Sequence, residues 1–93
     1  VLTLMYGYYM SGSHGDVVKT ASRYEREIDG APTHLAILAG AQAMLGQQAA
    51  AEATAARVRR SAPFFNAETL ADLIAAPSDR AGFLEGLNRA GLD

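Results

Sequence analysis

Few residues of this chain have types and spacing suited to chemistry, and its two histidines, His14 and His34, come first. A protein metal site needs three or four ligands at defined spacing, and neither histidine has a His-x-x-x-His partner or an acidic ligand pattern. Ser13, His14 and Asp16 include the residue types of a nucleophile, a base and an orienting acid. Residues so close together in one turn cannot adopt the geometry of such a triad. We therefore expect a turn histidine and a helix-start histidine without catalytic roles.

Two further kinds of site are excluded by the glycines and by the absence of cysteine. Gly7, Gly12 and Gly15 are not followed by lysine and Ser/Thr at the spacing of a phosphate-binding loop. A chain with no cysteine has no disulfide, thiol nucleophile or thiolate metal site. The sequence therefore predicts no catalytic residue, no cofactor and no metal, and we expect that this segment is not an enzyme.

Composition restricts the class of partner. The 93 residues correspond to one domain. Alanine supplies much of the 49% apolar fraction, so we expect a core that buries little apolar area per residue. A net charge of -2 and a pI of about 5.6 do not favour nucleic acid, and no apolar run approaches the roughly 18 residues of a membrane span. We expect a cytoplasmic protein, and we interpret the chain from Val1 onward as the C-terminal fragment of a longer protein.

Apolar residues at helical spacing predict an all-α chain. Within 16–28 they are spaced by four, three and four residues, and within 33–45 they cover almost every side of the helix. A strand was the alternative for 2–10, but no second strand-like run exists to pair with it. The predicted helices are 2–10, 16–28, 33–45, 47–60, 67–75 and 79–90.

Local signals predict how these helices begin and end. The N-cap candidates are Asp16, Asn66 and Ser78. Gly91 fits a left-handed C-terminal cap, in which Leu92 packs back on Leu87. Phe64 and Phe65, after Pro63, are expected to seal the gap between the fourth helix and the terminal helices.

Two landmarks predict an internal repeat. Gly15 and Gly46, and likewise Pro32 and Pro63, are 31 residues apart, so each unit reads as helix, glycine turn, helix and proline. We divide the single domain 1–93 into a first helix pair at 1–32, a second pair at 33–63 and capping helices at 64–93. Stacked helix pairs bury a shared core and typically bind other molecules.

The second pair resembles the tetratricopeptide repeat (TPR) family, whose period is about 34 residues. The matching residues are Leu38, Ala39, Leu45, Gly46, Ala51, Ala55, Val58 and Pro63. The family has aromatic residues at the positions of Leu35 and Gln42 and a small residue at the position of Thr20, so this chain differs from the family's pattern at all three positions. The resemblance implies antiparallel helix pairs stacked as a short superhelix.

A narrower resemblance covers 33–93 and is most specific in Gly86-Leu87-Asn88-Arg89-Ala90-Gly91-Leu92. This stretch is similar to the C-terminal tails of bacterial multidomain regulators, in which TPR arrays follow a class III adenylate/guanylate cyclase domain or a winged-helix domain. The resemblance implies a regulatory or protein-binding role. The catalytic metal-binding aspartates of such cyclases lie in another domain.

The first helix of each TPR pair lines a concave groove, and this predicts where a partner would bind. The groove candidates are Leu2, Met5, Tyr6, Tyr9, Ala36, Gly40, Ala43 and Met44. Aromatic and methionine side chains suit apolar peptide recognition. The alternative is that these residues pack on an upstream repeat or on a second copy. Arg57, Arg59 and Arg60 either bind an acidic partner or form a solvated helix end.

These observations favour a non-catalytic protein-protein interaction or regulatory module at the C-terminus of a bacterial signalling protein such as a nucleotide cyclase. The expected partner is a protein or peptide segment, another domain of the same chain, or a second copy in a homodimer. The alternatives are a structural dimerisation or capping domain with no external ligand, and the sensor end of a winged-helix transcriptional regulator.

Overall fold

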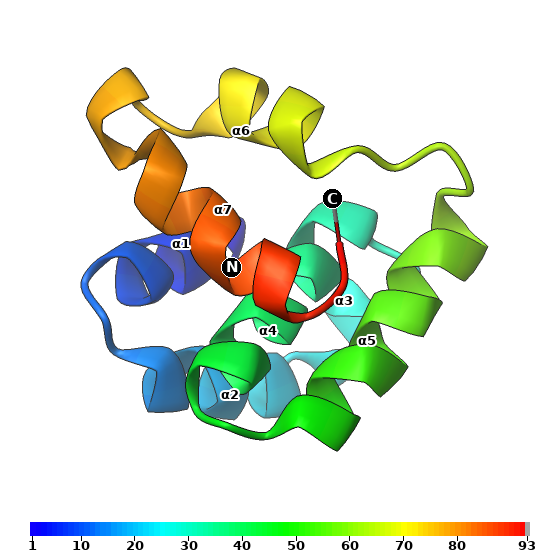
Figure 1. Cartoon of the computed structure of the whole chain (residues 1–93). Helices are drawn as coiled ribbons and strands as arrows, with labels where there is room; N and C mark the ends of the chain where they lie inside the picture. The colour runs from blue at the N-terminus through cyan, green and yellow to red at the C-terminus, as the bar shows by residue number, and fades with distance from the viewer. Residues whose placement is uncertain (93) are drawn as a thin grey trace.

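A computed structural model describes residues 1–92, and in this part of the chain all regular structure is helical (Figure 1). The all-α prediction is confirmed. The elements are α1 (Leu2–Met10), α2 (His14–Arg23), α3 (Glu25–Ile28), α4 (Pro32–Met44), α5 (Gln48–Ser61), α6 (Ala67–Ile74), the short 3-10 helix η1 (Pro77–Asp79) and α7 (Arg80–Arg89).

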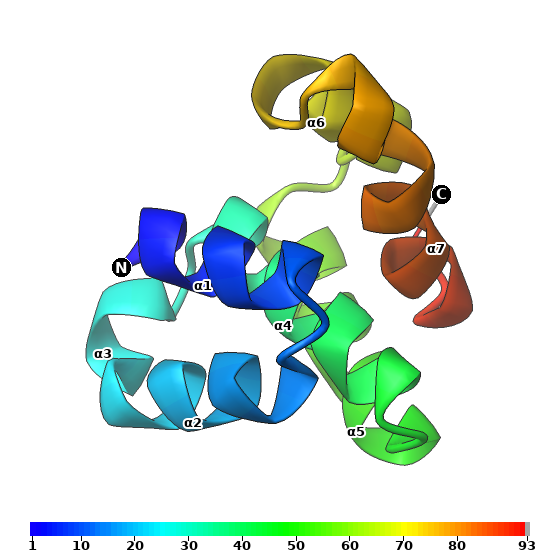
Figure 2. The same ribbon diagram turned by 90° about the vertical axis from the view of Figure 1, so that its left-hand side faces the viewer.

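Helix α4 is the centre of the fold. It packs against α1 and α2 on one side, α5 on another and α7 on a third, as the two views in Figures 1 and 2 show. Every residue from Leu35 to Ala41 is buried, as expected for a helix with apolar side chains on all sides. Alanine and glycine along α4 keep its radius small, and this allows its neighbours to approach from three directions.

The glycine turns of the two helix pairs correct the predicted repeat offset. Gly12 and Gly46 have φ angles of 82° and 80°, whereas Gly15 lies inside α2. Both turns carry the same two hydrogen bonds, in which the glycine N–H and the next N–H return to the preceding helix. Gly12, not Gly15, is therefore the counterpart of Gly46, and the two lie 34 residues apart rather than 31.

The new offset also aligns the interiors of the second helices. Thr20 corresponds to Thr54 and Ala21 to Ala55, and all four residues are buried. Thr54 donates a hydrogen bond of 2.7 Å to Oε1 of Gln42, which ties α5 to α4. With an offset of 31 residues, Thr20 aligns with Ala51, so the identity of Thr20 with Thr54 and of Ala21 with Ala55 is not seen.

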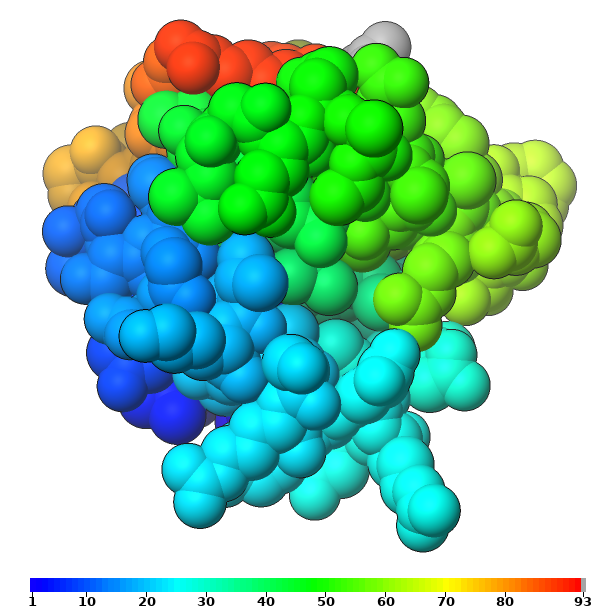
Figure 3. Space-filling model, turned by 90° about the horizontal axis from the view of Figure 1, so that it is seen from below, coloured from blue at the N-terminus to red at the C-terminus, as the bar shows by residue number. Residues whose placement is uncertain are grey.

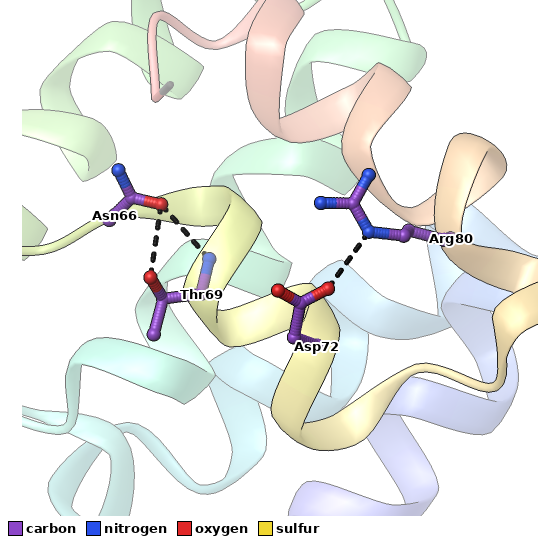
Figure 4. Close-up of polar contacts among 4 residues, drawn as sticks. All are labelled: Asn66, Thr69, Asp72 and Arg80. Carbon is purple, nitrogen blue, oxygen red and sulfur yellow. Dashed lines mark hydrogen bonds and ion pairs between the residues drawn. The ribbon is translucent and has the colours of Figure 1, made fainter.

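Helix starts follow the predictions at one of three positions. Oδ1 of Asn66 accepts from the backbone N–H of Thr69 at 2.9 Å, so the predicted cap of α6 is confirmed (Figure 4). Asp16 is not a cap, because α2 begins two residues earlier, after Ser13. Ser78 is not one either, because it lies inside η1, and Asp79 precedes α7. The predicted helix 16–28 is also divided, since Tyr24 leaves the helical conformation between α2 and α3.

Figure 3 shows the face where α2 and α3, in blue to cyan, lie beside the end of α4 and α5, in green, with part of α7 visible at the edge. Charged residues of α2 and α3 are exposed, namely Lys19, Arg23, Arg26 and Glu27.

The C-terminal end closes as predicted. Gly91 has a φ of 93°, and the N–H of Leu92 donates to the carbonyl of Leu87 at 2.9 Å. Leu87 and Leu92 are both fully buried, so the left-handed cap and its apolar contact are confirmed. Arg80 on α7 forms an ion pair of 3.0 Å with Asp72 on α6 (Figure 4), linking the two terminal helices.

Candidate protein-binding groove

Helix α7 lies against α1 and α4, over the surface predicted to bind a partner (Figure 1). The hydroxyl of Tyr9 donates a buried hydrogen bond of 2.8 Å to the carbonyl of Phe83. The two rings are in edge-to-face contact at 5.7 Å, and the ring of Tyr6 lies 5.9 Å from Phe83. Two aromatic residues of α1 thus hold one aromatic residue of α7, in arrangements that aromatic pairs favour.

Two glycines let α7 approach α4 closely. A Cβ atom on Gly86 would collide with the Tyr9 hydroxyl and would lie 3.0 Å from the carbonyl oxygen of Gly40. A Cβ atom on Gly40 would lie 3.0 Å from Cδ1 of Leu87. The absence of both side chains therefore sets the depth to which α7 is seated.

The residues predicted to line a partner-binding groove are all at least partly covered. Met5, Tyr9, Ala36, Gly40 and Ala43 are buried, and Leu2, Tyr6 and Met44 are half-buried. Residues of α7 account for this cover at Tyr6, Tyr9 and Gly40. At these three positions the surface predicted to bind a partner is covered by the chain's own helix.

Two side chains of α5 form hydrogen bonds with the C-terminal end of α7. Nε2 of Gln48 donates to the carbonyl of Arg89 at 2.9 Å, and the guanidinium of Arg59 donates to the carbonyl of Gly91. Both bonds satisfy carbonyls that a helix end leaves without intrahelical partners. Arg57 forms an ion pair of 3.3 Å with Asp29. Two of the three arginines proposed for an acidic partner therefore make contacts inside the chain.

The phenols of the groove stay neutral. Burial, with a smaller contribution from Glu85, raises the pKa of Tyr9 to about 12. Burial and the charge of Asp79 also raise the pKa of Tyr6. A neutral phenol is a hydrogen-bond donor, and this is the role that Tyr9 has towards Phe83.

Within residues 1–92, neither histidine lies in a group of possible metal ligands. Burial lowers the pKa of His34. The ring of His14 packs edge-to-face on Tyr9 at 5.4 Å. Residues 1–92 contain no group of three His, Cys, Asp or Glu side chains placed to hold a metal ion.

Three residues that pack against this surface were not assigned to it from the sequence: Phe83, Gly86 and Leu87. Phe83 and Leu87 are apolar residues four positions apart, so both lie on one face of a helix. Gly86 also carried a signal, because a glycine inside a helix costs about 1 kcal/mol relative to alanine and indicates a packing requirement.

A second apolar feature lies where the loop at 62–66 joins α5 to α6, beside the start of α4. Phe65, Leu70, Leu73 and Pro32 line an open pocket of about 250 Å³. Phe64 is 98% exposed and Leu73 is 77% exposed, so Phe65 packs against the core whereas Phe64 does not. The prediction that both phenylalanines seal this junction is wrong for Phe64, because residues 62–66 run as a loop that turns its side chain outward.

None of the helices described between residues 1 and 92 has the length and apolar character needed to cross a membrane. A scan against protein-family models and searches of curated proteins and of solved structures found no match to this chain. Its function is therefore inferred from its own residues.

Proposed function

We propose that this chain is a non-catalytic protein-interaction module with TPR-like helix pairs, whose α1/α4 groove binds an amphipathic helix. In the closed form, α7 is the resident occupant, and a partner helix replaces it. The proposed setting is the C-terminal region of a bacterial cytoplasmic signalling protein, after either a nucleotide cyclase domain or a winged-helix domain. That setting rests on the resemblance of residues 33–93.

The observation that carries the proposal is the seating of α7. Phe83 lies between Tyr6 and Tyr9, and Leu87 lies against Gly40. Anchors at i and i+4 of an amphipathic helix in an apolar groove are typical of helix-in-groove recognition. The chain already uses this mode on itself, so the groove has the shape that a partner helix would need.

The test uses the full chain with Gly86→Ala, which loosens α7 without changing any residue of α1 or α4. Labelled amphipathic helical peptides with an aromatic residue and a leucine four positions apart are titrated by fluorescence polarisation. Polar helical peptides of equal length and charge are the controls. We expect the apolar-striped peptides to bind the variant at least tenfold more tightly than they bind the wild-type chain, because α7 no longer competes as well. Equal, negligible binding by a folded Gly86→Ala chain argues against an interaction role.

The parent protein is tested separately by reading the natural gene upstream of the Val1 codon. A cyclase domain with its paired metal-binding aspartates supports the tail of a signalling enzyme. A winged-helix domain supports the sensor end of a transcription factor.

A structural dimerisation domain is the second candidate, and the exposed pair Phe64 and Leu73 favours it. Exposed apolar side chains beside an apolar pocket are typical of contact surfaces. Light scattering over a range of concentrations tests it: a dimer that Phe64→Ser converts to a monomer supports this candidate, and a monomer at all concentrations removes it.

A further inference from the structure

We infer that the cleft between α2 and α5 binds a free α-amino acid with an aliphatic side chain. The cleft has a volume of about 190 Å³ and is lined by side chains of α2, α3, α4 and α5, the helices of the face in Figure 3. None of its lining residues belongs to α1 or α7. The inference therefore goes beyond the proposed function and does not depend on it. Sites for drug-sized molecules begin at roughly 300 Å³, so a cleft of this size suits a smaller ligand.

The buried side chains of the cleft are mainly apolar and come from three helices. Ala21 of α2, Ile28 of α3 and Leu38 of α4 are all buried. Val18 of α2 is half-buried and lines the same cleft. An aliphatic chain of a few carbons that lies against them leaves water, and this favours its binding.

A polar pair lies among these apolar residues. Gln42 is the single polar residue between Leu35 and Leu45 on α4, and it is half-buried. Thr54 is only 4% exposed and donates a hydrogen bond of 2.7 Å to Oε1 of Gln42. This bond occupies the amide oxygen, and within residues 1–92 no protein group accepts from the amide nitrogen, Nε2. Gln42 therefore offers two N–H donors at the cleft.

Two opposite charges border the same cleft, Arg57 and Glu25. Arg57 has five N–H donors, and one of them forms an ion pair of 3.3 Å with Asp29. The side chain of Asp29 is 75% exposed, so this pair is weak and the carboxylate of a ligand can replace it. Glu25 is exposed and takes part in no ion pair within residues 1–92. Its carboxylate is an acceptor for an ammonium group.

These groups together match the zwitterion of an amino acid. The ligand carboxylate accepts from Arg57 and from Nε2 of Gln42, and its ammonium group donates to Glu25. The aliphatic side chain packs against Ile28 and Leu38. The charges of Glu25 and Arg57 cancel, so a zwitterion satisfies both, whereas a simple anion or cation leaves one of them without a partner.

The test titrates L-leucine into the full chain by isothermal titration calorimetry. Three analogues each lack one group: 4-methylpentanoate has no ammonium group, leucinamide has no carboxylate, and glycine has no aliphatic side chain. We expect L-leucine to bind with a dissociation constant in roughly the micromolar to millimolar range. Each analogue should bind about tenfold more weakly or worse, because one of the three contacts is lost.

Variants locate the site on the chain. Glu25→Gln removes the charge that faces the ammonium group, and Gln42→Glu replaces the N–H donors with an oxygen while it keeps an acceptor for Thr54. Each should weaken the binding of L-leucine by about tenfold or more. Glu27→Gln is the matched control, because Glu27 is an exposed residue of α3 that does not line the cleft. It should bind L-leucine within about twofold of wild type.

Four outcomes overturn the inference. The first is a folded wild-type chain that gives no heat of binding at about 10 mM L-leucine. The second is an analogue that binds as tightly as L-leucine. The third is binding of L-leucine that neither Glu25→Gln nor Gln42→Glu changes. The fourth is tighter binding of the dipeptide Leu-Gly, which would assign the cleft to the N-terminus of a peptide.

Circular dichroism checks that each variant is folded. Glu25 is exposed, so Glu25→Gln keeps the test decisive even if Gln42→Glu does not fold. Because α1 and α7 do not line the cleft, failure of this inference leaves the proposed function unchanged.

Discussion

Tyr9 and Phe83 are 74 residues apart in sequence and are joined by a buried hydrogen bond of 2.8 Å. This bond links the first helix to the last one across the central helix α4. The hydroxyl meets a helix carbonyl, and the glycine that leaves this carbonyl accessible lies one turn further along α7. A surface expected to be open to partners is thereby closed by the chain itself.

Gly86→Ala should destabilise the fold, whereas Gly82→Ala should not. The new methyl group at position 86 meets the Tyr9 hydroxyl and the Gly40 carbonyl, and overpacking of this kind costs about 1–3 kcal/mol. At position 82 the methyl group has space, and the higher helix propensity of alanine should stabilise the helix by up to about 1 kcal/mol. Urea unfolding followed by circular dichroism measures both. Similar midpoints for the two variants contradict the close approach of α7 to α1 and α4.

Tyr9→Phe should lower the free energy of unfolding by about 0.5–1.5 kcal/mol, because it removes one buried hydrogen bond and keeps the ring. The Phe83 carbonyl remains inside a helix, so the loss stays moderate. Tyr8→Phe, on the same helix and half-buried, is the matched control. A Tyr9→Phe chain as stable as wild type would show that the bond contributes nothing to α7 docking.

Alkaline pH should weaken the fold through Tyr9. Burial raises the pKa of its hydroxyl from 10.0 to about 12. Below pH 10 the group is protonated in both states, so its full contribution is present. Between about pH 10 and 12 the unfolded chain releases the proton and the folded chain keeps it, so stability falls as pH rises, by about 2–3 kcal/mol in total.

Urea midpoints of wild type and Tyr9→Phe, measured at about pH 9 and about pH 11.5, test this dependence on ionisation. The difference between the two chains should shrink or reverse at the higher pH. Tyr6, whose pKa burial also raises, is present in both chains and so leaves the comparison intact. A difference that is the same at both pH values rules out a buried, neutral Tyr9.

Gly91→Val should cost about 1–3 kcal/mol, because a β-branched residue is strained at a φ of 93°. The strain would also displace Leu92 from its contact with Leu87. Gly7→Ala is the control, since Gly7 lies inside α1, where a Cβ atom meets open space. Thermal unfolding compares them. An unchanged melting temperature for Gly91→Val would contradict the left-handed cap at Gly91.

Substitutions of Phe64, in the loop before α6, and of Phe83, in α7, should have very different effects on stability. Phe83→Ala should destabilise by about 3–5 kcal/mol, because the side chain is fully buried. Phe64→Ser should change stability by no more than about 0.5 kcal/mol, because the side chain is 98% exposed. Urea unfolding of both variants at low protein concentration gives the comparison. A large loss for Phe64→Ser would mean that this side chain packs within the chain.

What the sequence determined by itself was local. The all-round apolar pattern of 33–45 predicted the buried helix α4, Asn66 predicted the start of α6, and Gly91 with Leu92 predicted the end of α7. Each of these depends on contacts within a few residues, so the chain encodes them in short patterns. The predicted repeat offset was wrong because residues 7–15 contain three glycines that could form the turn between the helices. Only the backbone conformation identifies Gly12 as the counterpart of Gly46.

Tertiary structure alone decided what lies in the groove. No local pattern relates Tyr9 to Phe83 or Gly40 to Gly86, because these contacts form only when the loop at 62–66 returns the chain over α1 and α4. The same path of the chain turns the side chain of Phe64 outward, although phenylalanine is a residue type that is often buried. Side-chain type sets which residues gain from burial, but the route of the chain sets which of them meet.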